Sequence, residues 1–153
     1  MAILFFTLLI VVLDQIAKLA IRSRFYLGES HEVLGNFLRF TYVQNPGIAF
    51  GIHFDGNPIF TIFAAIASVI IVIYLYRMRK SRFTYRLSLA LILGGAIGNL
   101  IDRFAYGKVI DFIDLGIGTK RWPFVFNIAD MGVTIGIVIL ISLVFLDKDE
   151  KQM

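Results

Sequence analysis

The sequence contains no cysteine, and this absence excludes several kinds of site. Without a thiol, the chain can form no disulfide and can offer no thiolate to a metal or a substrate. Histidine is almost as scarce, because only His31 and His53 occur, and neither stands in a recognisable motif with serine or a carboxylate. We therefore expect neither a histidine-based triad nor a zinc site, and no metal or other cofactor.

Charged residues are also scarce, at 17% of 153 residues against 58% hydrophobic residues. Soluble domains carry about 25% charged residues, so this composition predicts a membrane protein. We expect one integral membrane domain over residues 1–153. The net charge of +4 could indicate a nucleic-acid partner, but the basic residues cluster in short segments beside apolar runs. That pattern is typical of orientation in a membrane, so we expect contact with lipid and none with nucleic acid.

Four apolar stretches approach the roughly 20 residues that a helix needs to cross a bilayer. They cover residues 3–21, 57–76, 87–103 and 130–146. The first resembles a secretory signal, but no basic residue precedes its apolar part and charged residues interrupt its end, so we expect a retained helix. The sequence predicts an all-α membrane protein with four transmembrane helices.

The connection between the second and third stretches sets the expected orientation. It holds five basic residues, namely Arg77, Arg79, Lys80, Arg82 and Arg86. Such a short basic loop is expected to be cytoplasmic. Four crossings then place both termini in the cytoplasm and both long connections, residues 22–56 and 102–129, on the outer side. Arg22, Arg24 and Arg39 oppose this weakly, but long loops translocate with less regard to charge.

The first long connection contains a short run of strand-forming residues, Phe37 to Gln44. Its partial alternation predicts a small β element on the outer membrane surface, ended by the turn-forming residues Asn45, Pro46 and Gly47. The element is either a platform for an extended peptide or a solvent-side decoration. Glycines four residues apart also occur in the third and fourth apolar stretches, at Gly94 and Gly98 and at Gly132 and Gly136. Because small residues let helices approach closely, we expect these two helices to pack together.

Polar residues gather at the ends of the last two apolar stretches, where they are costly and often mark a working site. They are Asn99, Asp102, Arg103, Asp111, Asp114, Asn127 and Asp130. Two carboxylates in a poorly hydrated place share one proton, and such a pair can cut a peptide bond without serine, cysteine or metal. Spacing alone leaves several possible pairs among the four aspartates. It also leaves the first-stretch pair Asp14 and Lys18, four residues apart, as either self-neutralising, which we favour from spacing, or part of the site.

Five motifs together resemble the bacterial lipoprotein signal peptidase family, also called signal peptidase II. They are LDQIAK at Leu13–Lys18, NPGIAF at Asn45–Phe50, GGAIGNLIDR at Gly94–Arg103, VIDF at Val109–Phe112 and FNIAD at Phe126–Asp130. The resemblance covers nearly the whole chain. It implies a four-helix aspartyl endopeptidase of the bacterial inner membrane that removes prolipoprotein signal peptides, cutting just before a cysteine that carries diacylglycerol.

The resemblance also implies roles for particular residues. Asp111 and Asp130 match the catalytic dyad. Asn45, Gly95, Asn99, Arg103 and Asn127 match positions that line the site and hold the dyad or the substrate backbone. Asp14 and Lys18 match a supporting polar pair, which reverses the interpretation from spacing. Asp102 is expected to be structural, orienting Arg103, and Asp114 matches no catalytic position.

The resemblance implies prolipoprotein signal peptides with diacylglyceryl-cysteine as partners, an active site toward the outer face, and a monomer. Two other functions fit the composition: a small transporter or channel subunit, and a non-catalytic lipid-binding or assembly protein. A transporter predicts polar positions spread across the membrane depth, whereas here they concentrate toward one side, which favours an enzyme site.

Overall fold

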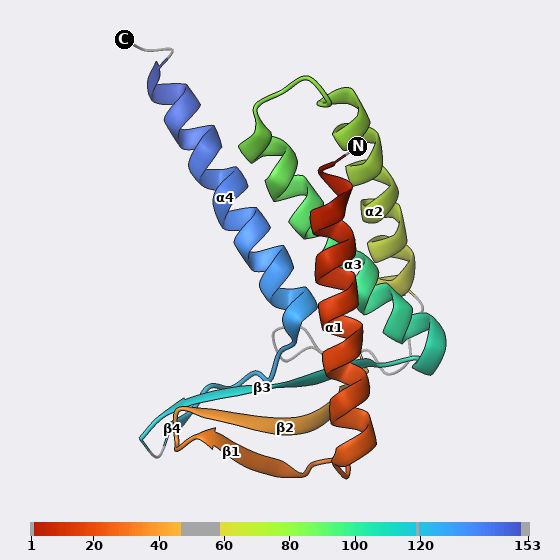
Figure 1. Cartoon of the computed structure of the whole chain (residues 1–153), viewed down its shortest axis with the longest axis vertical. Coiled ribbons are helices and arrows are strands. Elements are labelled where there is room, and N and C mark those ends of the chain that lie inside the picture. Colours follow the sequence, from red (N-terminus) through yellow and green to blue (C-terminus); the bar gives the residue numbers. More distant parts are fainter. Residues whose placement is uncertain (1, 47–58, 119, 151–153) are drawn as a thin grey trace.

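The computed structural model describes residues 2–46, 59–118 and 120–150. Four helices form a bundle, and a four-stranded sheet lies at one end of it (Figure 1). The elements in chain order are α1 (Leu4–Arg24), β1 (Ser30–Leu34), β2 (Leu38–Asn45), α2 (Ile59–Arg77), α3 (Phe83–Tyr106), β3 (Val109–Ile117), β4 (Lys120–Arg121) and α4 (Ile128–Glu150). Part of the sequence motif at residues 45–50 lies outside the described residues.

Each expected apolar stretch forms a helix. Helices α3 and α4 extend beyond the expected bounds at both ends, and α1 extends beyond them at its C-terminal end. Three segments are long and apolar enough to cross a membrane, namely Leu4–Arg24, Phe83–Tyr106 and Ile128–Leu146. Within the part of the chain described, α2 offers the shorter apolar stretch Thr61–Arg77. Membrane-spanning helices are therefore established, and the count of four crossings stays a prediction.

The β element expected at residues 37–44 is confirmed as β2, but the sheet is larger than expected. Half of its strands come from the second long connection, because β3 and β4 complete the antiparallel order β1-β2-β3-β4. An all-α description with β structure only in the first outer loop is thus incomplete. The strand at Val109 was missed because it is buried on both faces and lacks an apolar–polar alternation.

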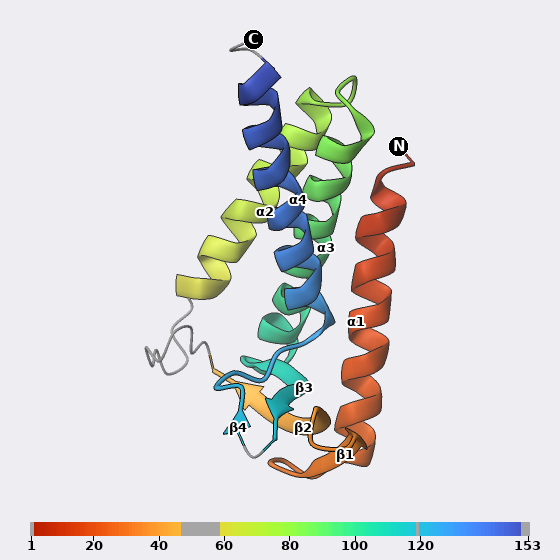
Figure 2. The ribbon, with the colours of Figure 1, turned by 90° about the vertical axis from the view of Figure 1, so that its left-hand side faces the viewer.

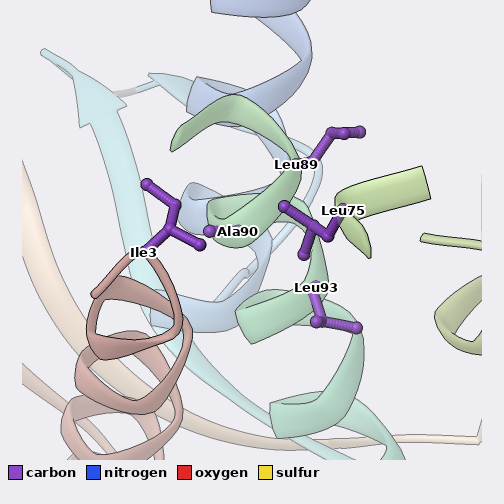
Figure 3. Close-up of a cluster of buried hydrophobic side chains, with 5 residues drawn as sticks. All are labelled: Ile3, Leu75, Leu89, Ala90 and Leu93. Atoms are coloured by element: carbon purple, nitrogen blue, oxygen red, sulfur yellow. The ribbon is translucent and has the colours of Figure 1, made fainter. Parts of the chain in front are cut away.

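Two apolar clusters hold the bundle and the sheet together. The first joins α1, α2 and α3 at the end of the bundle away from the sheet, through Ile3, Leu75, Leu89, Ala90 and Leu93 (Figure 3). The second fixes the sheet to the other end of α1, through Ile21, Tyr42, Ile110 and Phe112. The start of β3 is therefore anchored on a helix rather than suspended in solvent.

Close backbone packing joins α3 to α4, as the glycines predicted. A Cβ atom added at Gly136 would lie 2.6 Å from the carbonyl oxygen of Ser88, and one added at Gly95 would overlap the carbonyl oxygen of Ala129. Gly94 faces the other way, because its Cβ would lie 2.9 Å from the Thr7 carbonyl oxygen on α1. Helix α3 thus has a glycine surface on two sides and lies between α1 and α4.

Candidate active site

Asp111 and Asp130 come from different elements and meet where the sheet joins the bundle. Asp111 is the third residue of β3, is 3% exposed, and pairs with Val43 just after an irregularity in the β2–β3 register. Such irregularities change the direction of side chains along a strand. Asp130 lies in the first turn of α4. Figure 2 shows the β3 strand passing beneath the start of this helix.

The start of α4 is a capping box that positions Asp130. The Oδ1 atom of Asn127 accepts a hydrogen bond from the Asp130 backbone N–H at 2.9 Å, and the Asp130 carboxylate accepts one from the Asn127 N–H at 3.1 Å. This reciprocal arrangement satisfies two amide groups near the helix start. It also holds the Asp130 side chain against the N-terminal end of α4 instead of letting it extend into solvent.

The side chain of Asn127 connects the two aspartates. It is fully buried. Its Nδ2 atom donates a hydrogen bond to Asp111 Oδ1 at 2.7 Å, and its Oδ1 atom accepts one from the Asp130 backbone N–H. Each carboxylate also accepts a bond from a second amide. Asn45 Nδ2 donates to Asp111 at 3.0 Å, and Asn99 Nδ2 donates to Asp130 at 2.8 Å. Of the four candidate aspartates, the structure thus joins Asp111 and Asp130 as a pair.

A buried ionic group lies behind this pair. The Lys18 ammonium contacts Asp14 Oδ2 and Asp102 Oδ2, each at 2.8 Å, and donates to Asn99 Oδ1 at 2.9 Å. All three charged residues are at most 2% exposed. Taking charges out of water is costly, so such a group persists only where good geometry compensates it. Asp14 and Lys18 do neutralise one another. Lys18 also donates to Asn99, which in turn donates to Asp130, so the ionic group is linked to the dyad.

The two carboxylates of this group hold the backbone next to the dyad. Asp14 Oδ1 accepts a hydrogen bond from the N–H of Ala129 at 2.9 Å, one residue before Asp130. Asp102 Oδ2 accepts one from the N–H of Ile110 at 3.0 Å, one residue before Asp111. Asp102 therefore points to α1 and β3, whereas the sequence had suggested that it orients Arg103.

Sequence reasoning missed Gln15 as a site residue. Its Nε2 atom lies 3.0 Å from Asp102 Oδ1 and 3.1 Å from the Gly98 carbonyl oxygen, so it ties α1 to α3 beside the ionic group. A signal was present, because Gln15 is a polar residue between Asp14 and Lys18 in an otherwise apolar stretch.

The other expected site residues differ in how closely they approach the dyad. Gly95 lies at the α3–α4 contact, where it lets α4 come close rather than offering a polar group. Arg103 is half-buried, and its guanidinium makes a long hydrogen bond of 3.4 Å to the Asn99 carbonyl oxygen. Asp114 is outside the site, because it pairs with Arg121 at 2.7 Å and accepts from Thr41 on the sheet.

The environment of Asp111 favours the protonated acid. Burial and the nearby Asp130 carboxylate raise the pKa of Asp111 to about 7, although hydrogen bonds from Asn45 and Asn127 oppose the rise. Asp130 lies in the first turn of α4. Two carboxyl groups so placed can share one proton, and the raised pKa of Asp111 makes Asp111 the candidate acid. Within the described residues, no three His, Asp or Glu side chains are grouped as metal ligands.

A cavity of about 940 Å³ borders the site on the side of Asp130. It lies between the first two turns of α4 and the hairpin formed by β3 and β4, and we call it the hairpin cavity. Its lining is mainly apolar, including Leu115, Trp122 and Phe126. Asp130 therefore borders a volume that can take an apolar ligand.

Comparison with known proteins identifies the family. The sequence profile of the family described as signal peptidase (SPase) II matches residues 6–146. The chain belongs to this family. It is 42% identical over 151 residues to the lipoprotein signal peptidase of Moorella thermoacetica, a match that covers 99% of this chain and 97% of that protein. It is also 46% identical over 145 residues to the lipoprotein signal peptidase of Syntrophomonas wolfei, covering 95% and 93% of the two chains.

Solved structures agree with this assignment. A bacterial membrane enzyme determined at 2.3 Å resolution superposes with a TM-score of 0.83 and 33% identity, over 98% of this chain and 91% of the other. A second bacterial membrane enzyme, at 1.9 Å, gives a TM-score of 0.77 and 32% identity, over 94% and 92%. The signal peptidase II chain described here is therefore a bacterial membrane peptidase, and a transporter or a non-catalytic assembly protein is excluded.

Proposed function

We propose that this signal peptidase II protein removes signal peptides from diacylglyceryl-modified prolipoproteins, cutting on the amino side of the lipidated cysteine. Asp111 and Asp130 are the catalytic dyad. The observation that carries the proposal is the buried Asn127, which hydrogen-bonds to both carboxylates from separate elements. The side-chain amide of Asn127 donates to Asp111 and its backbone N–H donates to Asp130, so one residue keeps the two acids in a fixed relation, which a one-proton mechanism requires.

The reaction uses the two aspartates in different protonation states. Ionised Asp130 removes a proton from water, and the resulting hydroxide attacks the scissile carbonyl carbon. Protonated Asp111 donates its proton to the carbonyl oxygen as negative charge develops there. Collapse of the tetrahedral intermediate breaks the C–N bond as the proton now on Asp130 passes to the leaving amine. Asp111 takes back a proton from one hydroxyl of the intermediate as the new carboxyl group forms, so both aspartates return to their starting states. No metal, nucleotide or covalent enzyme intermediate takes part.

The neighbouring polar residues support this chemistry. Asn45 and Asn99 each donate one hydrogen bond to a dyad carboxylate, which fixes its orientation. Asp14 and Lys18 act behind them as positioning residues, and Gly95 allows the approach of α4. Arg103, held by one long hydrogen bond, is placed to take a backbone carbonyl of the substrate.

The protein works in the bacterial inner membrane with four crossings, both termini in the cytoplasm and the active site toward the outer face. The basic connection between α2 and α3 supports this orientation, because it lies at the end of the bundle opposite the sheet, together with the N-terminal end of α1 and the C-terminal end of α4 (Figures 1 and 2). In this proposal the protein acts as a monomer.

The test is cleavage of a diacylglyceryl-modified prolipoprotein by the purified protein in detergent. Asp111→Asn and Asp130→Asn remove ionisation while nearly preserving shape, so each should reduce kcat by about a thousandfold or more while substrate binding persists. Asp114→Asn is the matched control, because it removes a carboxylate from the same strand outside the site, and it should retain cleavage.

Two outcomes would reject the proposal. Folded native protein that leaves the lipidated substrate intact contradicts the function. Either dyad variant cutting at a rate near that of the native protein contradicts the catalytic assignment.

A further inference from the structure

The hairpin cavity extends from the dyad along α4. One of its walls is a stripe on the first two turns of that helix, where four-residue spacing sets side chains on one face. The stripe consists of Asp130, Met131, Thr134 and Ile135. The β3–β4 hairpin forms the facing wall, and Figure 1 shows this hairpin and α4 diverging from the place where the chain enters the helix.

Exposed apolar side chains lie at the rim of the cavity. Met131 and Ile135 on α4 are 42% and 49% exposed, and Ile117 at the hairpin tip is 83% exposed. Exposed apolar side chains on a helix that can cross the membrane face hydrocarbon. A hydrocarbon chain can therefore pass sideways from the bilayer into the cavity without crossing water.

The cavity offers little to a peptide backbone. An added peptide strand needs free N–H and C=O groups on a sheet edge. On this side of β3 those groups are already used: Trp122 N–H donates to the Leu115 carbonyl oxygen at 2.7 Å, and Ile113 and Phe126 exchange hydrogen bonds at 2.7 and 3.1 Å. A peptide in the cavity would bury unpaired amide groups, which is unfavourable, whereas an acyl chain has none.

We propose that the hairpin cavity holds one acyl chain of the substrate's diacylglyceryl group, and that Thr134 and Ile135 contact the methylene groups of this chain that lie farthest from Asp130. This inference rests on the proposed function, because it concerns the substrate of the same site. A free phospholipid is a weaker choice of occupant, since the cavity ends at Asp130. A ligand in the cavity therefore lies next to the carbonyl group that is attacked. The diacylglyceryl group must lie there, because it is attached to the cysteine beside the scissile bond. Its volume of about 940 Å³ is within the range of pockets that bury whole small ligands, about 300–1,000 Å³.

The test compares lipidated peptides that differ only in acyl length, one palmitoyl and one octanoyl. Thr134→Phe places a ring in the cavity one helical turn from Asp130. The ratio of KM between variant and native protein is measured for each substrate, so that differences in detergent partitioning cancel. We expect KM for the palmitoyl substrate to rise about tenfold, because the displaced methylene groups lose their burial, with little change in kcat or in KM for the octanoyl substrate.

Val144→Phe is the control, since it adds the same ring to an exposed position on α4 beyond the cavity and should leave both KM values unchanged. Ile135→Phe provides a second cavity variant should the first fail to fold. An equal rise of KM for both substrates, or no rise for either, overturns the acyl-chain assignment and favours a peptide or a free lipid as occupant. Native protein that cuts neither substrate rejects the proposed function instead, so the two failures are distinguishable.

Discussion

Lys18 is the residue around which the support of the site is built. Its ammonium lies between two buried carboxylates, and each carboxylate holds the backbone N–H that precedes a dyad aspartate. Removing one partner of a buried ion pair costs about 3–5 kcal/mol, because the other charge is left uncompensated. Helix α1, which carries neither of the two proposed catalytic aspartates, thus helps to set their relative position.

The raised pKa of Asp111 predicts how the rate of cleavage depends on pH. The pKa of its buried carboxyl is raised to about 7, and the proposed mechanism needs its protonated form. We expect kcat/KM to fall as the pH rises through about 7, by about tenfold for each further pH unit. Initial rates with a fixed lipidated substrate between pH 5 and pH 9 measure this limb. A rate that rises across this range would show that Asp111 acts as the base.

Stability gives an independent check on the same carboxyl. Because the folded-state pKa lies above the ordinary value of 3.8, the folded protein binds more protons than the unfolded chain between about pH 4 and pH 7. The contribution of Asp111 to the unfolding free energy therefore falls as the pH rises over this window, by up to about 4 kcal/mol. Asp111→Asn should abolish this part of the pH dependence of Tm. An unchanged pH dependence in the variant would contradict the raised pKa.

At the scale of elements, the hydrogen bonds in the first turn of α4 both stabilise the start of the helix and position Asp130. Its N–H groups at Ala129 and Asp130 are satisfied by Asp14 and Asn127, which also contact the ionic group and the dyad. A helix start without such partners would leave buried donors unpaired. The same hydrogen bonds that begin the helix therefore fix the position of Asp130, the proposed catalytic carboxylate.

The close contact between α3 and α4 predicts that adding one methyl group at Gly95 lowers the rate of cleavage. Gly95→Ala would place its Cβ against the Ala129 carbonyl oxygen, a backbone atom that cannot rotate away. We expect α4 to shift and cleavage to fall on the order of a hundredfold, because small displacements of a catalytic group are costly. Helical content by circular dichroism should be retained.

Gly132→Ala is the matched control for this prediction. Its nearest neighbour is the Cγ2 atom of the Ile10 side chain at 3.0 Å, which can move, and the Leu91 carbonyl oxygen lies at 3.4 Å. This variant should keep most of its activity. Equal losses in both variants would mean that general packing, rather than the approach of α4 to the dyad, decides the activity.

At the scale of the whole molecule, the charge pattern and the fold predict one orientation in the membrane. The chain has no cysteine, so a single introduced thiol gives an unambiguous label. Val33→Cys lies on the exposed strand β1, and Lys80→Cys lies in the basic connection between α2 and α3. With a membrane-impermeant maleimide on cells whose outer barrier is open, we expect Val33→Cys to react and Lys80→Cys to react only after lysis.

Labelling of Lys80→Cys before lysis would contradict the orientation. The cysteine-free parent protein controls for background, and both variants should retain cleavage because neither position contacts the site. The same experiment places the dyad, which lies with the sheet at the end opposite the basic connection.

The sequence by itself determined the membrane class, the helical stretches and the family. Long apolar runs, a short basic loop and several ordered motifs are local features, and local features can be read without coordinates. The strand at residues 38–45 and the packing of α3 on α4 were also predictable, because each has a short-range signal in residue type and spacing.

Only the tertiary structure decided which aspartates lie together and which partners the other charged residues have. Asp102, Asp111, Asp114 and Asp130 look equivalent in the sequence, yet one pairs with Lys18, one with Arg121, and two share Asn127. These partners are up to 115 positions apart in the chain, as Asp14 and Ala129 show. Spacing along the chain carries no information about such contacts, because folding brings together segments that have no common period.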